Sequence, residues 1–334
     1  MVLIWREVRT EYHTQDVCTS KEQVQNETII DCTGSVVVAV CFARTNPELT
    51  APVQTVSQGP HYRTVSQIAP VRTNHNGRIF YKTNAYTELA VGMHRPNQSG
   101  ALVDANPQIE IQQAGGAIAS QARHSVYFPG ELCSDAIQVV TPDGKTLTSR
   151  PVGLAYSDGI QSVFIAELRT NITGQLLASD NEVLYSNICD SETCRLDLLC
   201  RNKLSGFESD LIIRTRLPEP QDFGFTNSAT MKLQWWTEFF NPPTPAKTST
   251  ALPNGSVNEV LDFGELKMQL GKGFFIGLPS PGAQVIISKQ WVTIEGRTFL
   301  VEELPQSMIA ARLSHLEEYH AQLDINSGGA LGNN

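Results

Sequence analysis

Apolar and polar residues alternate with a period of two along much of this chain, and this alternation constrains the fold more than any other sequence feature. It is clear in residues 137–140 (IQVV), 162–168 (SVFIAEL) and 232–240 (KLQWWTEFF). Successive side chains of a β-strand point to opposite faces of a sheet, so the alternation indicates strands. Glycine and proline interrupt it at intervals of roughly 10 to 20 residues, which predicts an antiparallel β-sandwich.

Two segments have the residues of a tight turn between two strands. TPDGK at residues 141–145 joins β-rich runs, and in it proline presets one turn residue while glycine supplies a positive φ. WVTIEGRTFLV at residues 291–301 has Glu-Gly at its centre. We expect a β-hairpin at each segment.

Helical spacing is scarce and occurs near the C-terminus. In residues 306–319, Ser307 can cap a first turn, and Ile309, Leu313 and Leu316 recur at helical spacing. We therefore predict an all-β chain of antiparallel β-sandwiches with one short C-terminal helix. A change of composition near residues 100–106 marks a domain boundary. The expected domains are an N-terminal β-rich domain at 1–105, a β-sandwich domain at 106–305, and a helix with a flexible tail at 306–334.

Composition and charge exclude several classes of partner. The 334 residues carry a formal net charge of −9 and contain no basic run, so we expect no nucleic-acid partner. The longest apolar run, residues 36–43, is far shorter than the roughly 20 residues that cross a bilayer, so we expect no membrane span. Residues 1–7 lack the features of a secretory signal. Three interpretations stay open: the chain is not exported by that route, it is a mature product, or it is a fragment.

The seven cysteines leave at least one thiol without a partner in the chain. Cys133 stands alone, and the C-x4-C-x5-C spacing of the second group below does not fit a zinc ribbon. Local disulfides in an oxidising compartment and buried free thiols both remain open as interpretations. The disulfide candidates fall into two groups, Cys18, Cys32 and Cys41, then Cys189, Cys194 and Cys200.

Sequence motifs for catalysis are lacking. The chain has no G-x-S-x-G elbow, and its seven histidines form neither H-x-x-x-H nor H-E-x-x-H. Gly271-Lys272-Gly273 lacks the spacing of a phosphate-binding loop and fits a turn. We expect no catalytic residue, no metal site and no cofactor, and we do not expect an enzyme.

The segment QWWTEFFNPP at residues 234–243 is the strongest candidate for a binding surface. Strand alternation places Trp235 on one face, and Trp236 with Phe240 on the other. Core packing on both faces is the favoured interpretation, and a ligand platform on the second face is the alternative. Exposed aromatic rings stack on sugars, so the candidate binding residues are Trp236, Phe240, Trp291 and Tyr156.

Four segments resemble a β-rich region near the N-terminus of very large, uncharacterised bacterial proteins of extracellular or surface character, some of which carry Rhs/YD-type repeats. They are residues 126–159, 230–245, 261–277 and 289–305, and the resemblance covers about residues 105–305. That family offers no catalytic residues to carry over. This chain departs from it in its larger number of cysteines and in ending soon after Pro305.

The resemblance implies a bacterial protein located outside the cell or on its surface. We therefore predict a non-enzymatic structural or adhesive β-module that self-assembles into a surface fibre or layer, or binds another surface protein. Residues 1–8 are either a donor strand for such assembly or an ordinary first strand. A carbohydrate-binding module that stacks glycans is the alternative, and a glycan hydrolase is a third hypothesis.

Overall fold

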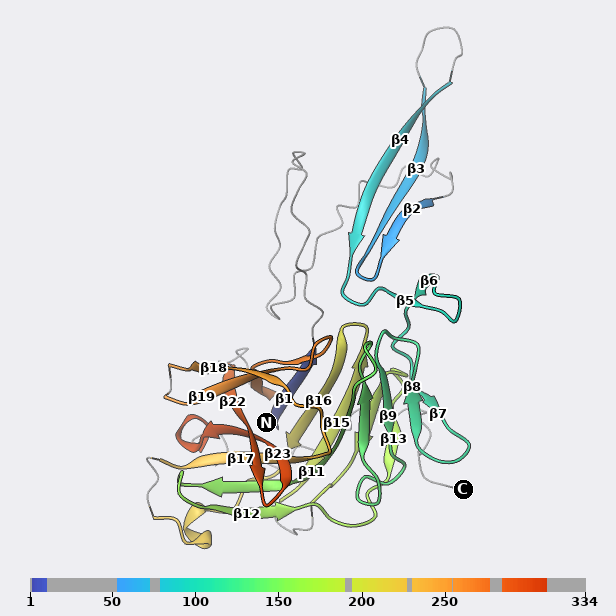
Figure 1. Ribbon diagram of the computed structural model, residues 1–334. Coiled ribbons are helices and arrows are strands. Elements are labelled where there is room, and N and C mark those ends of the chain that lie inside the picture. The colour runs from blue at the N-terminus through green and yellow to red at the C-terminus, as the bar shows by residue number, and fades with distance from the viewer. Residues whose placement is uncertain are drawn as a thin grey trace. The chain divides into compact units, whose positions relative to one another are not determined.

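The computed structural model describes residues 2–10, 53–72, 79–189, 194–226, 230–253, 255–276 and 284–310 (Figure 1). In these ranges every registered strand pair is antiparallel, which confirms the all-β prediction. No α-helix of seven or more residues occurs there, and the helical elements are two 3-10 turns, η1 (Pro220–Phe223) and η2 (Gln306–Met308). The C-terminal helix predicted for 306–319 therefore begins as a 3-10 turn, and its residues 311–319 lie outside the described residues.

The chain forms two compact units. The main unit contains residues 1–12 and 106–334, and the inserted unit contains residues 13–105. The first strand, β1 (Val2–Thr10), was assigned to the N-terminal domain on sequence but belongs to the main unit, because both of its edges pair with strands of that unit. Residues 13–105 thus interrupt the main unit in sequence.

The inserted unit contains a meander of three strands, β2 (Gln54–Gly59), β3 (Tyr62–Arg72) and β4 (Ile79–Leu89). A hairpin of β5 (His94–Pro96) and β6 (Leu102–Asp104) follows. His94 is fully buried and donates from Nδ1 to the Gly59 carbonyl oxygen at 2.7 Å, which ties the hairpin to the meander.

The first sheet of the main unit is assembled from both ends of the chain. β1 lies in its centre, with β16 on one side and β21 on the other. A hairpin beside it, β18 with β19, is linked to β1 through β20. In spatial order the strands are β13 (Gly174–Leu176), β14 (Glu182–Tyr185), β15 (Leu196–Lys203), β16 (Gly206–Ile213), β1 and β21 (Gly271–Ile276), with the attached β18 (Ala246–Ala251), β19 (Val257–Asp262) and β20 (Lys267–Met268).

The second sheet is built around β11 and β17, which pair along most of their length. β22 joins the two sheets, because its first residues pair with β21 and residues 288–294 pair with β23. In spatial order the strands are β7 (Glu110–Ile111), β8 (Ala117–Ala119), β9 (Ser125–Phe128), β10 (Ile137–Val140), β11 (Thr146–Ser157), β17 (Lys232–Phe240), β23 (Arg297–Pro305) and β22 (Val285–Ile294), with β12 (Ser162–Glu167) beside the second half of β11.

Both hairpins expected from turn residues are present. β10 pairs with β11 up to Val140 and Thr146, and Gly144 between them has a φ of 82°. β22 pairs with β23 up to Ile294 and Arg297, so Glu295 and Gly296 form a two-residue turn in which both φ values are positive. The local turn chemistry therefore sets these two registers.

One large hydrophobic cluster fills the main unit. The second sheet contributes Leu154, Leu233 and Leu300, and the first contributes Leu198 and Ile213, all of them at most 2% exposed. Several of these strands are buried on both faces, for example β16, in which seven of eight residues are buried, so alternation alone does not give the buried face.

A buried histidine closes one end of this core. His124 is 2% exposed, and its Nε2–H donates to Asn202 Oδ1 at 2.8 Å. Asn202 in turn donates from Nδ2 to the Pro107 carbonyl oxygen at 2.8 Å. Burial lowers the pKa of His124 from 6.5 to about 4, because the charged imidazolium loses its hydration.

We predict that His124 makes stability depend on pH. As pH falls from 6.5 toward 4, the histidine of the unfolded chain takes up a proton while the folded one stays neutral, so stability is progressively lost, by up to about 3 kcal/mol. Thermal unfolding of the wild type and His124→Gln at pH 7 and pH 4.5 measures this. The wild type should lose more stability between these pH values than the variant; equal losses would contradict the prediction.

Candidate functional site

The two neighbouring tryptophans of β17 lie in different environments. Trp235, opposite Leu154 and Glu302, is 3% exposed in the core. Trp236 points to the outer face of the second sheet, opposite Gly153, and is partly exposed. Gln234 and Glu238, on the same face as Trp236, are each 7% exposed, so this second face is also largely covered, in line with the favoured interpretation, and Trp236 is one of its more open residues.

Trp236 is the centre of an aromatic group on that outer face. Phe164 of β12 and Phe299 of β23 contact it edge-on, with ring centroids at 5.9 and 5.6 Å and interplanar angles of 64° and 68°. Trp236 donates from Nε1 to Gln234 Oε1 at 3.1 Å. A Cβ at Gly153 would collide with the carbonyl oxygen of Ala166, so glycine permits the close approach of β11 and β12 beneath these rings.

Two arginines extend the group into an outer aromatic face, defined as Trp236, Phe164, Phe299, Phe240, Arg150 and Arg297. The Arg297 guanidinium lies 5.0 Å from the Phe299 ring centroid and makes two hydrogen bonds of 2.7 Å to Glu238. Arg150 lies 5.3 Å from the Phe240 ring centroid and donates to the Cys133 carbonyl oxygen at 2.7 Å. These cations stabilise the face through cation–π contacts.

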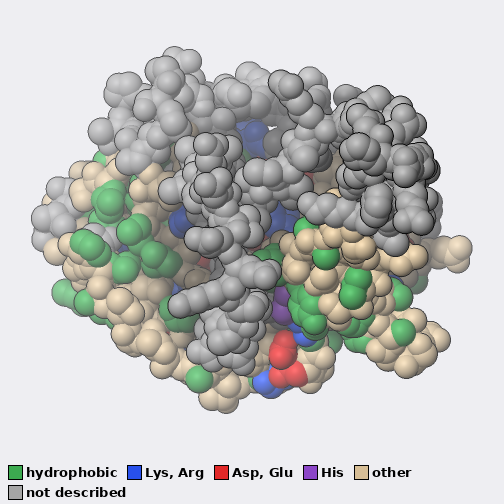
Figure 2. Space-filling model, turned by 90° about the horizontal axis from the view of Figure 1, so that it is seen from above, with side chains coloured by type: hydrophobic (Ala, Val, Ile, Leu, Met, Phe, Trp, Pro, Cys, Tyr) green, Lys and Arg blue, Asp and Glu red, His purple; other side chains and the backbone are tan. Residues whose placement is uncertain are grey.

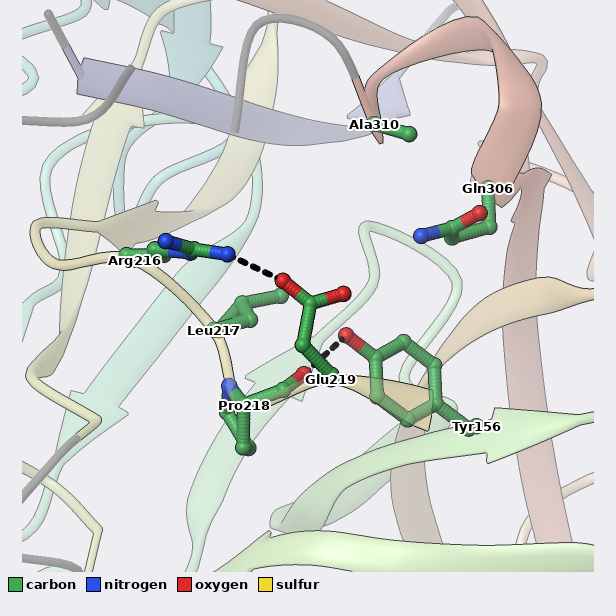
Figure 3. Close-up of a pocket in the computed structure, with 7 residues that line it drawn as sticks. All are labelled: Tyr156, Arg216, Leu217, Pro218, Glu219, Gln306 and Ala310. Carbon is green, nitrogen blue, oxygen red and sulfur yellow. Dashed lines mark hydrogen bonds and ion pairs between the residues drawn. The ribbon is translucent and has the colours of Figure 1, made fainter. Parts of the chain in front are cut away.

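Tyr156 lies at the edge of a small pocket, shown in Figure 3. Its ring is buried, and its hydroxyl donates to the Pro218 carbonyl oxygen at 2.9 Å. Arg216 and Glu219 form an ion pair beside it, and both side chains are more than half exposed. The pocket, of about 240 Å³, is lined by Tyr156, Arg216, Leu217, Pro218, Glu219, Gln306 and Ala310.

The chemistry of Tyr156 suits packing better than catalysis. Burial raises the pKa of its phenol, and the nearby Glu219 carboxylate and Cys194 thiol raise this pKa further. A phenol whose proton is donated to a carbonyl and whose ionisation is disfavoured makes a poor acid or base at neutral pH. Tyr156 thus anchors the segment before η1 to the core.

Trp291 is a core residue. Its ring packs against Phe239 and Phe263, with centroids at 4.7 and 5.7 Å. Its backbone N–H donates to Glu259 Oε2 at 2.6 Å, and its carbonyl oxygen accepts from Lys247 Nζ at 2.7 Å. Of the four candidate binding residues, the structure therefore brings Trp236 and Phe240 to one face and buries the rings of Tyr156 and Trp291 elsewhere.

The sequence did not identify the other members of the outer aromatic face. Phe164 and Phe299 come from β12 and β23, and their contact with Trp236 depends on which strands are neighbours in the sheet. Each lies in an alternating apolar run, which was a visible signal for a strand but gave no information on its neighbours.

No disulfide occurs among the cysteines that the structure describes, so the bridges expected at Cys189, Cys194 and Cys200 are not formed there. Cys133 is partly exposed, and the other three thiols are buried. Cys200 lies on β15 opposite Val183 and Ser209, which keeps it away from the other two thiols. Cys18, Cys32 and Cys41 lie outside the described residues.

β18 presents an open strand edge. All six of its side chains are exposed, and its one registered partner among the described strands is β19. Figure 1 shows it at the margin of the main unit, beyond β19. Within the described ranges, no strand pairs with its outer backbone N–H and C=O groups, so this edge can accept another strand.

The exposed apolar side chains do not form one continuous patch on the face drawn in Figure 2. Hydrophobic side chains lie there in several groups separated by other atoms. Within the described ranges, no group of three or more histidine, cysteine, aspartate or glutamate side chains is arranged to hold a metal ion. The same ranges contain no helix long and apolar enough to cross a membrane.

Comparison with known proteins gives no relative for this chain. No protein-family model matches it, and neither a curated protein nor a solved structure does so. The site must therefore be argued from its own geometry.

We predict that the Glu238–Arg297 pair stabilises the outer aromatic face in a pH-dependent way. The hydrogen bonds from Arg297 lower the pKa of Glu238, so their stabilising effect is present above the unfolded value of about 4.3 and is lost as pH falls below it. Because Arg297 is largely exposed, the loss in Glu238→Gln should be only about 0.5 to 1 kcal/mol at pH 7.

Urea unfolding at pH 7 and pH 3 measures this difference. Glu238→Gln should be less stable than the wild type at pH 7 and should match it at pH 3. Glu167→Gln, on an exposed site of β12, is the control and should equal the wild type at pH 7. A difference of the same size at both pH values would contradict the assignment to the ionised pair.

Proposed function

We propose that this chain is a non-enzymatic structural β-sandwich module of a bacterial surface or extracellular protein, which associates with a second copy of itself by strand addition at β18. The observation that carries the proposal is the open edge of that strand. In strand addition the main-chain hydrogen bonds of an edge provide the affinity, and the exposed side chains adjust the fit.

The composition of β18 supports this use of its edge. Natural edge strands are commonly protected by proline, by lysine or by a bulge. The sequence AKTSTA contains no proline, and the amine of its one lysine, Lys247, donates to the Trp291 carbonyl oxygen at 2.7 Å. Threonine also favours extended backbone. The hairpin of β18 and β19 is in continuous register over six pairs, so the edge is a regular template.

The distribution of aromatic side chains supports a structural role over sugar binding. Trp235, Trp291 and Tyr156 are used in the core, and their rings are not open to a ligand. Trp236 is partly exposed, but Phe164 and Phe299 contact it from neighbouring strands. A sugar platform needs a flat ring face that is free, so the backbone edge is the better candidate for recognition.

The location in this proposal rests on the resemblance to β-rich regions of large bacterial surface proteins that is inferred from the sequence of residues 105–305 alone. In such proteins a module that adds strands would link neighbouring chains.

Proline substitutions at two adjacent positions of β18 test the proposal. In an antiparallel ladder, neighbouring residues alternate between N–H groups that point to the partner strand and N–H groups that point outward. One of Thr248→Pro and Ser249→Pro therefore removes an outward N–H and leaves the pairing with β19 intact, while the other breaks that pairing and lowers the Tm. The two variants serve as controls for each other.

Sedimentation velocity over a range of concentrations gives the readout. We expect the wild type to associate reversibly, and the variant that keeps the wild-type Tm to remain a monomer. A wild type that is monomeric at all concentrations, or a variant of wild-type Tm that still associates, would overturn the proposal.

A further inference from the structure

Two buried thiols face each other at the end of the β14–β15 hairpin. Cys189 and Cys194 are 3% and 0% exposed and lie in the main hydrophobic cluster. Between the arms that carry them, the Ile188 N–H donates to the Leu196 carbonyl oxygen at 2.7 Å, so the backbones are held side by side. The Cys189 thiol donates to the Cys194 carbonyl oxygen.

The two thiols are not equivalent. Hydrogen bonding from the Cys194 side chain lowers the pKa of Cys189, and the Leu196 N–H and the positive charge of Arg169 contribute in the same direction. The same contact and burial raise the pKa of Cys194. Cys189 is therefore the sulfur that ionises first, and the thiolate is the form that attacks a disulfide.

We propose that Cys189 and Cys194 are a disulfide-forming pair, which closes residues 189–194 into a ring when a low-molecular-weight disulfide is present. The Cys189 thiolate attacks one sulfur of that disulfide and releases one thiol. The Cys194 sulfur, after losing its proton, then attacks the Cys189 sulfur of the mixed disulfide and releases the second thiol. Two protein thiols are oxidised to one disulfide, and the donor disulfide is reduced to two thiols.

The register excludes Cys200 as a partner. Cys200 pairs with Val183 and Ser209. It lies four strand residues beyond Leu196, about 13 Å further along β15. A disulfide needs Cα atoms within about 7 Å of each other, so Cys200 is out of reach of Cys194. Cys133 lies in the turn before β10, where its carbonyl oxygen accepts from Arg150.

The ring would fix a junction between the two sheets. Cys189 makes an isolated bridge with Leu168, just after β12 of the second sheet, while Cys194 leads into β15 of the first. Cys194 also lies close enough to Tyr156 to influence its ionisation. A covalent closure at this point secures the hairpin in an oxidising environment. This inference does not depend on strand addition at β18.

Peptide mapping of the wild-type protein tests the pairing directly. The protein is incubated with glutathione disulfide until its thiol content is constant, and the remaining thiols are blocked with N-ethylmaleimide in denaturant. It is then digested with trypsin without reduction and analysed by mass spectrometry. Cleavage after Arg169, Arg195 and Arg201 places both cysteines in peptide 170–195 and Cys200 in peptide 196–201.

The expected result is a peptide 170–195 that is two hydrogen atoms lighter than its sequence mass and carries no maleimide, with one maleimide on peptide 196–201. Two maleimides on peptide 170–195, a stable glutathione adduct on it, or its linkage to peptide 196–201 would each overturn the proposal. In Cys194→Ser, the same treatment should leave Cys189 bound to glutathione or maleimide.

Discussion

The pairing of β1 on both of its edges is the interaction on which the main unit depends. Residues 3–10 pair with 206–213 of β16, and residues 2–6 pair with 272–276 of β21. Without β1, these two strands would be open edges in the middle of a sheet. Because β21 continues into β22, and β22 passes into the second sheet, β1 holds together segments from the beginning, middle and end of the chain. Residues 13–105 lie between β1 and its partners in the sequence. Bringing these strands together costs conformational entropy, and this cost grows only slowly with the length of the loop.

The same sheets leave little room for a site made of side chains. Aromatic residues on the inner faces, including Trp235 and Trp291, are buried in the core. On the outer face of the second sheet, Trp236 is held by its neighbours, and the arginines nearby are engaged with Glu238 and aromatic rings. The backbone edge of β18 is therefore the better candidate for recognition among the described residues.

Short-range features of the sequence indicated the all-β class and several strands, but not which faces are buried, because β16 and β17 are covered on both sides. Alternation in 232–240 separated Trp235 from Trp236 correctly, and the residues at 141–145 and 295–296 fixed two hairpins through local turn chemistry. The partners of β1 could not be predicted, because β16 and β21 lie about 200 and about 270 residues away and any apolar strand satisfies the same pattern. Strand order and register also determine whether Phe164 contacts Trp236 and whether Cys189 approaches Cys194. The separation of Cys200 from these two cysteines follows only once the register of β15 is known.

Hydrogen–deuterium exchange of the backbone amides of β1, read by mass spectrometry, tests the central role of this strand. If β1 is the inner strand between β16 and β21, its amides are protected on both sides and should exchange as slowly as those of β16. Exchange should then require unfolding of the whole main unit. The amides of β18 that point outward should exchange quickly in monomeric protein. Amides in residues 3–6 that exchange as fast as those of the β18 edge, while β16 remains protected, would contradict the account.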